Sequence, residues 1–211
     1  CDALLVNNTI VNCGRGVRLF DHFDRHGPPY CLNPGSGRVT LLNCILWDCP
    51  TSLLLTDSPD GHSYAAVAYC DIEGGQATAS VSANSTLVWD SSNLDVDPRF
   101  AFASTNDFRL LAGSPCIDAG TNLSATVTGD FDGMPRPLDG NGDGMAGFDV
   151  GAFEFLLATA DSNGDGIPDG WCQRYGFSPL DASVAPGNPD DDPHTTYQEW
   201  LADTDPTDPL S

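Results

Sequence analysis

The chain of 211 residues carries 30 acidic and eight basic residues, a formal net charge of −22 that argues against nucleic acid and anionic membranes as partners. The acidity is almost entirely aspartate, 27 Asp against 3 Glu, and lysine is absent, a bias that general solubility does not explain. Short-armed Asp is favoured in tight turns and in cation-binding loops. A hydrophobic content of 40% is enough for a packed core. No apolar run reaches the ~18 residues of a membrane-spanning helix, so we expect no membrane span.

Three segments in the first third of the chain resemble one another and predict repeated short strands. They run from Val6 to Cys13, from Leu41 to Cys49 and from Val67 to Gly74, with Gly/Pro/Asp-rich loops of unequal length between them. This pattern favours parallel turns stacked along one axis, and therefore an all-β fold with a parallel β-helix (a solenoid) over residues 1–157. An ordinary β-sandwich is the alternative, because its strands also alternate.

The register of these strands is predicted from an alignment of Asn8, Asn43 and Tyr69, which gives spacings of 35 and 26 residues. This alignment stacks Thr9 with Cys44 and Cys70 in one column. We also expect Ile10, Ile45 and Ile72 to occupy equivalent positions on successive turns. The isoleucine column is expected to be buried.

The eight cysteines include no C-x-x-C pair, so zinc and thioredoxin chemistry have little support. An even number of cysteines beside cation-type loops favours an oxidising, extracellular setting. Cys13 and Cys49, at matching strand ends, are the better candidates for a disulfide. Cys44 and Cys70 are expected to stay stacked thiols, because parallel Cβ vectors disfavour a bond between them.

Further along, several short motifs occur in a fixed order. They are Asp95-Val-Asp97-Pro98-Arg99-Phe100, Ser114-Pro-Cys-Ile-Asp-Ala-Gly120, Asp130-Phe-Asp-Gly-Met-Pro-Arg136 and Gly151-Ala-Phe-Glu-Phe155. In this combination the chain from about Val39 to Phe155 resembles the end of the choice-of-anchor family of right-handed parallel β-helices in secreted bacterial surface proteins. The resemblance implies a β-helix, a final strand over Val150–Leu157 and a place outside the cell, but no activity.

Two copies of one loop flank that final strand and point to calcium. Oxygen-bearing side chains alternate in both, closed by a glycine that allows a sharp turn, which suits a hard cation. The candidate ligands are Asp139, Asn141 and Asp143 in the first copy, and Asp161, Asn163, Asp165, Ile167 and Asp169 in the second. A plain turn held by Asx side chains is the alternative in each case, and the first copy has Val150 where the twelfth ligand should stand.

Residues 161–211 resemble the thrombospondin type 3-like calcium repeats of bacterial secreted proteins, and we expect a small module with two short helices. Pro168 suits the first turn of one helix and Gly176 its end. In a further loop the implied ligands are Asn188, Asp190, Asp192, the carbonyl of His194, and Glu199. Thr196-x-x-Glu199 is also a capping box, which would give Glu199 a purely structural role. The chain departs from the family at Cys172, where Glu is usual, and at Pro193, where glycine is usual.

Catalysis has little support in the sequence. Only the loop with Asp21, His22, Asp24, Arg25 and His26 brings an acid, a base and a cation together, and a solvated connection explains it more simply. No nucleophile-elbow motif is present. The chain is therefore expected not to be an enzyme.

We expect an extracellular or cell-surface structural or adhesive protein, a short β-helix stabilised by Ca²⁺. Because the chain begins directly in strand-like sequence, either an upstream part is missing or another molecule covers that end. The second option predicts head-to-tail association into homo-oligomers or filaments. The alternatives are the C-terminal portion of a secreted polysaccharide lyase or hydrolase and a carbohydrate-binding module, with a surface polysaccharide as the candidate partner.

Overall fold

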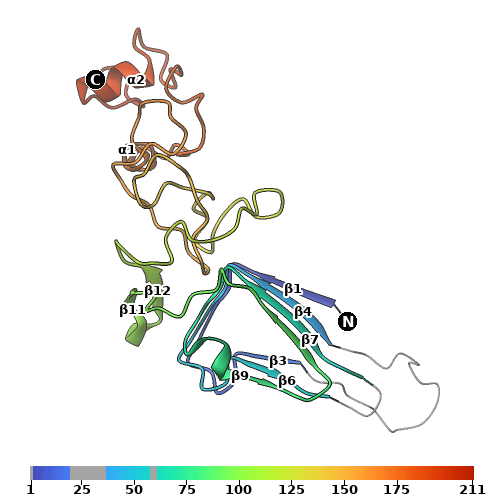
Figure 1. The fold of residues 1–211 in the computed structure, drawn as a ribbon. Coiled ribbons are helices and arrows are strands. Elements are labelled where there is room, and N and C mark those ends of the chain that lie inside the picture. Colours follow the sequence, from blue (N-terminus) through green and yellow to red (C-terminus); the bar gives the residue numbers. More distant parts are fainter. Residues whose placement is uncertain (1, 20–36, 58–60) are drawn as a thin grey trace, which may run out of the picture.

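A computed structural model describes residues 2–19, 37–57 and 61–211 of the chain (Figure 1). Ten of the strands belong to three parallel sheets. The four-stranded sheet contains β1 (Asp2–Val6), β4 (Arg38–Leu42), β7 (Tyr64–Ala68) and β10 (Thr86–Trp89). The second contains β2 (Thr9–Val11), β5 (Ile45–Trp47) and β8 (Asp71–Ile72). The third contains β3 (Val17–Leu19), β6 (Leu53–Leu55) and β9 (Ala79–Val81), the last preceded by the 3₁₀ turn η1 (Gly75–Thr78).

The chain visits the three sheets in the same order on each pass. β1, β2 and β3 lie in successive sheets, β4, β5 and β6 return to the same sheets, and β7, β8 and β9 do so again. In Figure 1 the sheets of β1–β4–β7 and of β3–β6–β9 form two sides of a triangle. The prediction of a β-rich fold built from parallel strands is confirmed.

Single residues in the left-handed conformation turn the chain from one sheet to the next. Asn7, Asn43 and Tyr69, with φ of 50°, 53° and 53°, follow the strands of the four-stranded sheet. Asn12 and Asp48, with φ of 55° and 52°, follow β2 and β5. Asn and Asp tolerate this conformation better than other non-glycine residues, because their short side chains bond locally. We call these turns between sheets corners. The left-handed conformation that a corner requires therefore explains why Asn and Asp follow most of the repeated strands.

The predicted register is wrong by one residue between the first two passes. Ile10 pairs with Leu46, and Leu46 pairs with Ile72, whereas Ile45 pairs with Thr9 and with Asp71. The corner that matches Asn43 is Asn7 and not Asn8. A slip of one residue reverses which side chains face inward, so Ile45 points out of the core that contains Ile72.

The main core lies between the three sheets. Its fully buried members are Val39, Leu41, Cys44, Leu46, Leu53, Leu55, Ala65, Val67, Cys70 and Ile72. The predicted contact of Cys44 with Cys70 is confirmed, because the Cys44 N–H donates to the Cys70 sulfur at 3.3 Å. Thr9 does not belong to that column. Cys13 and Cys49 are free thiols, so the predicted disulfide between them is absent from the structure.

After β10 the chain forms the hairpin of β11 (Phe100–Phe102) and β12 (Asp107–Leu110), joined by the 3₁₀ turn η2 (Ala103–Thr105). Residues 113–155 follow, are called the covering segment below, and pack in part against the outer face of the β2–β5–β8 sheet. There Ile45 packs with Cys116, Ile117 and Val150.

The strand predicted over Val150–Leu157 is not formed. The N–H groups of Val150 and Gly151 donate to the carbonyls of Cys116 and Asn43, and three later N–H groups donate to side chains. The N–H of Ala152 donates to Thr9 Oγ1, that of Glu154 to Asp130 Oδ2 and that of Phe155 to Asp149 Oδ2.

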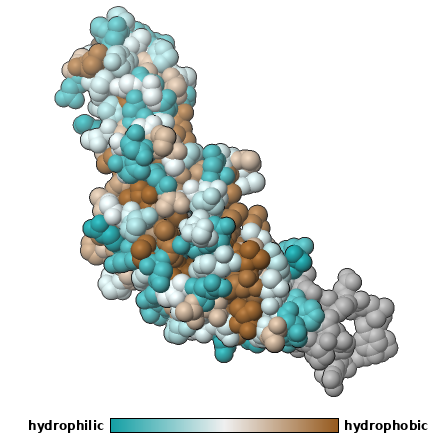
Figure 2. Space-filling model, in the orientation of Figure 1, coloured by the Kyte–Doolittle hydropathy of each residue, from teal (hydrophilic) through white to brown (hydrophobic). Residues whose placement is uncertain are grey.

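The C-terminal part contains α1 (Asp169–Arg174) and α2 (Thr196–Ala202), which confirms the two predicted helices. Pro168 is the N-cap of α1, and Gly176 follows the helix with φ of 79°. Figure 2 shows hydrophobic residues concentrated in the lower part of this face, over the sheets and the covering segment, while the C-terminal part at the top is mostly hydrophilic or intermediate. Among the described residues, neither helix is long and apolar enough to cross a membrane.

Candidate metal centre

Three carboxylates meet in the loop that leads into α2. Oxygen atoms of Asp190, Asp192 and Glu199 lie within 4.8 Å of one another. Within residues 2–19, 37–57 and 61–211 this is the one group of three or more His, Cys, Asp or Glu side chains placed closely enough to share a metal ion. These residues are three of the ligands predicted from the sequence, and together they could hold a metal ion.

The Glu199 carboxylate is the most informative member of the cluster, because it is buried and has no hydrogen-bond partner. The residue is 2% exposed, and neither of its carboxylate oxygens has a hydrogen-bond partner. Asp190 Oδ2 is buried without a partner as well. Burying an unpaired carboxylate costs several kcal/mol, and buried polar groups in folded proteins are nearly always bonded. The cluster therefore calls for a cation, or for a proton on Glu199.

The electrostatics of the cluster agree with this requirement. Burial raises the pKa of the Glu199 carboxyl, and the negative charges of Asp190 and Asp192 raise the pKa further. His194 lowers it, but does not offset these effects. A divalent cation would reverse the balance, because an opposite charge next to a carboxyl favours its ionised form.

The helix cap leaves Glu199 available for this role. Thr195 is the N-cap of α2, its hydroxyl accepts from the Gln198 N–H, and the Gln198 side chain accepts from the Thr195 N–H. This capping box lies one residue before the one predicted from Thr196 and Glu199, so that prediction is wrong. Glu199 projects from the first turn of α2 without serving its start.

Pro193 does not prevent the loop from turning. The left-handed position is taken by Asp191, with φ of 63°, and not by Pro193. The Asp192 carboxylate accepts from the His194 N–H at 2.6 Å, and the Asn188 side chain donates to the Asp192 carbonyl at 2.5 Å. Asn188 thus fastens the loop here through its amide nitrogen. The ligand roles predicted for the Asn188 side chain and for the His194 carbonyl stay predictions.

The two other predicted calcium loops fold alike. Asp139 accepts three backbone N–H groups, from Gly142, Asp143 and Gly144, at 2.7, 3.2 and 2.9 Å. Asp161 accepts from Gly164, Asp165 and Gly166 at 2.8, 3.2 and 2.8 Å. Asn141 and Asn163 each accept from the N–H two residues later. The sequence repeat is therefore a structural repeat, with carboxylates that are already hydrogen-bonded, and calcium in these two loops stays a prediction.

Ser162 joins the two loops. Its hydroxyl donates to Asp169 at 2.5 Å and accepts from the Asp139 N–H at 2.8 Å, while its own N–H donates to Asp169 at 2.9 Å. Asp169 is 1% exposed, and burial raises the pKa of its carboxyl. Asp169 therefore has a partner for each of its oxygens, in contrast to Glu199. Ile167, another predicted ligand, is a buried core residue whose N–H donates to Asp165.

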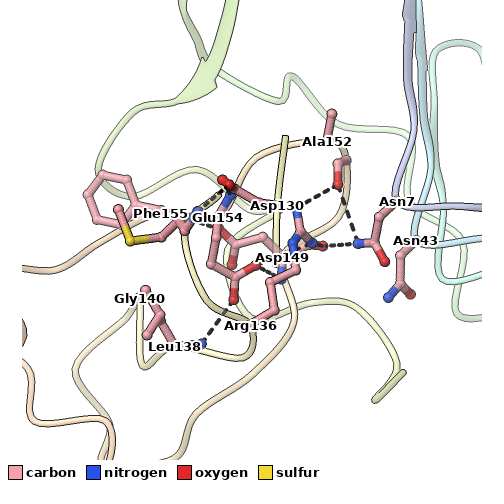
Figure 3. Close-up of polar contacts among 12 residues, drawn as sticks. Asn7, Asn43, Asp130, Arg136, Leu138, Gly140, Asp149, Ala152, Glu154 and Phe155 are labelled. Atoms are coloured by element: carbon pink, nitrogen blue, oxygen red, sulfur yellow. Dashed lines mark hydrogen bonds and ion pairs between the residues drawn. The ribbon is translucent and has the colours of Figure 1, made fainter. Parts of the chain in front are cut away.

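A second buried charge cluster, which the sequence does not predict, lies in the covering segment (Figure 3). Arg136 Nη1 lies 3.2 Å from a Glu154 carboxylate oxygen, and both side chains are fully buried. Asp149, also buried, donates its N–H to Glu154 at 3.3 Å. Arg136 and Glu154 belong to the family-like motifs quoted above, but nothing in those motifs shows that they meet. The acidic and basic loop from Asp21 to His26 lies outside the described residues.

Comparisons with models of protein families, with curated proteins and with solved structures find no match to this chain.

Proposed function

We propose that this chain is a parallel β-helix with a calcium-binding C-terminal module, and that it serves outside the cell as a structural or adhesive protein. The observation that carries the calcium proposal is the buried Glu199 carboxylate, which has no hydrogen-bond partner and lies beside Asp190 and Asp192.

The chemistry of the donor set favours calcium over other metals. Carboxylate oxygens suit hard cations, whereas zinc and copper prefer nitrogen and sulfur. Calcium accepts six to eight oxygens in flexible geometries, while magnesium demands a near-ideal octahedron. Asp190, Asp192 and Glu199 supply the charge, and the Asn188 side chain, the His194 carbonyl and water would complete the shell.

The small core of the C-terminal part gives the ion a structural purpose. Its buried apolar cluster consists of Ile167, Cys172 and Ala185, with four partly buried side chains around them. Small domains with few buried apolar groups commonly need a metal or a disulfide for stability. Cys172 is a free thiol, so a bound cation is the remaining device of this kind in the described part of the module.

The β-helix proposal rests on the order of the strands. Each of the first three passes of the chain adds one strand to each of three parallel sheets, and left-handed residues, most of them Asn or Asp, form the corners between the sheets. Such stacked turns give rigid, extended scaffolds. Extracellular calcium modules bind with Kd of about 10⁻⁴ to 10⁻³ M, so this site would be filled outside the cell.

Titration calorimetry tests the calcium site. The wild-type chain is titrated with calcium beside Glu199→Gln and beside Glu73→Gln, an exposed glutamate that serves as the control. We expect binding in the wild type and the control, and a loss of at least one binding event in Glu199→Gln. At a tenfold excess of calcium over Kd, the site would stabilise the fold by about 1.4 kcal/mol. Unchanged binding in Glu199→Gln, or no calcium binding in the wild type, would refute the proposal.

A further inference from the structure

The covering segment is fastened to two corners of the stacked strands. The Asn43 side chain donates to the Thr121 carbonyl at 2.9 Å and accepts from its N–H at 2.8 Å. The Asn7 side chain donates to the Asp149 carbonyl at 3.0 Å, and the Gly151 N–H donates to the Asn43 carbonyl at 2.8 Å. These contacts join residues as far as 142 positions apart in the chain.

The buried side chains of Arg136, Asp149 and Glu154 lie next to these attachment points. The Arg136 guanidinium donates to the carbonyls of Asp149 and Gly151 at 3.1 and 3.0 Å and pairs with Glu154. Asp149 and Glu154 are 0% and 8% exposed. One buried positive charge therefore faces two buried carboxyls, and full ionisation leaves an uncompensated negative charge away from water.

The hydrogen bonds indicate which carboxyl carries a proton. Burial raises the pKa of Asp149 to about 7, but its carboxylate accepts short bonds from the N–H groups of Asp118 and Phe155, at 2.8 and 2.6 Å, which favour its ionised form over that of Glu154. Glu154 accepts from Leu138 at 2.9 Å but only at 3.3 Å from Asp149. Burial, and then the charge of Asp149, raises the pKa of Glu154 to about 8, although Arg136 lowers it.

The other titratable groups around Arg136, Asp149 and Glu154 do not offset the raised pKa of Glu154. Asp118 adds a negative charge beside Asp149, and the Asp130 carboxylate accepts from the Glu154 N–H at 2.9 Å. The Cys116 thiol lies near enough to Asp149 to feel its charge, and it donates to the buried Asp71 carboxylate at 3.2 Å. Arg136 is the one cation that the described structure places in the network.

We propose that Arg136, Asp149 and Glu154 form a pH-sensitive clasp, which holds the covering segment on the β2–β5–β8 sheet while Glu154 is protonated and loosens it when Glu154 ionises. The sign follows from linkage: the attached state binds the proton more tightly than the released state, whose pKa is the ordinary 4.5. Attachment is therefore strongest in acid and is lost as the pH rises through about 8.

The chain offers a direct test of the proton on Glu154, because it contains only three glutamates. Carbon-13 labelling of glutamate gives three carboxyl resonances, which Glu73→Gln and the addition of calcium, expected to move Glu199, help to assign. We expect the Glu154 resonance to titrate above pH 7 with or without calcium. A Glu154 midpoint near its ordinary value would overturn the proposal, even if no variant folds.

Hydrogen exchange tests the loosening itself. The amides of Val150 and Gly151, bonded to the carbonyls of Cys116 and Asn43, report on attachment. After correction for intrinsic exchange, their protection in the wild type should fall by about tenfold or more between pH 6 and 9. In Glu154→Gln, which cannot ionise, the protection should not change over this range, whereas Glu73→Gln should behave as the wild type. Wild-type protection that does not depend on pH, or a Glu154→Gln profile like that of the wild type, would contradict the clasp.

Discussion

Ile45→Ala separates the observed register from the one predicted from the sequence. Ile45 is 1% exposed, and its side chain packs against Cys116, Ile117 and Val150 of the covering segment, outside the core between the sheets. The contact is close, because a Cβ added to Gly151 would lie 2.7 Å from Ile45 Cδ1. The substitution removes three buried carbons and leaves a cavity between the sheet and the segment.

Ile→Ala changes at buried sites cost about 2–5 kcal/mol, depending on how far the surroundings collapse. The covering segment lacks regular strands and helices at this contact and can adjust, so we expect about 2–3 kcal/mol from the lower half of that range. Urea unfolding in calcium buffer measures the free energy. Val88→Ala, at an outer position that is 47% exposed, is the control and should cost about 0.5 kcal/mol or less.

Ile45→Ala should also increase the alkylation rate of Cys116, a fully buried residue of the covering segment that packs in the same cluster as Ile45. In the sequence-predicted register Ile45 would belong to the inner core, and its loss would leave Cys116 protected. A cost below about 1 kcal/mol, or an unchanged alkylation rate at Cys116, would refute the contact.

Two further substitutions test local features. Burial raises the pKa of Asp71 to about 6, so Asp71 should contribute a loss of stability as the pH rises from about 4 to about 6; Asp71→Asn should remove this contribution and gain up to about 3 kcal/mol at pH 7 in thermal unfolding. A variant no more stable than the wild type at pH 7 would contradict the burial of a charged Asp71. Thr195→Ala removes the capping box of α2 and should cost about 1 kcal/mol; because α2 carries Glu199, calcium affinity by calorimetry should weaken about fivefold. Unchanged affinity would show that the helix start does not position Glu199.

Local patterns in the sequence predict local features of this fold well. The three similar segments predict the parallel strands, Pro168 and Gly176 predict the limits of α1, and the spacing of Asp190, Asp192 and Glu199 predicts the acidic cluster. In each case the residues that carry the signal are also the ones that make the contact. Short-range chemistry is therefore enough to predict them.

The errors arise where two neighbouring residues suit the same role. Asn7 and Asn8 are equally able to form a left-handed corner, and only pairing with β4 and β5 selects Asn7. Thr195 and Thr196 are both good N-caps, and the structure uses Thr195. Each choice moves the predicted position by one residue. For Asn7, a shift of one residue is enough to reverse the face of the sheet on which Ile45 lies.

The covering segment shows a different limit. Val150–Leu157 has the composition of a strand, but three of its N–H groups bond to the side chains of Thr9, Asp130 and Asp149, and the first two of these lie 143 and 24 positions away from their donors. The meeting of Arg136 with Glu154 depends on the same long-range packing. Neither periodicity nor composition carries that information.

The most direct test of the calcium site is a crystal structure of the chain grown with calcium, with anomalous data collected to locate the ion. We predict a peak bound by Asp190, Asp192 and Glu199, with calcium–oxygen distances of about 2.3–2.6 Å and both Glu199 oxygens engaged. A calcium-saturated crystal with no peak at these three carboxylates, or with Glu199 paired to another protein group, would contradict the account.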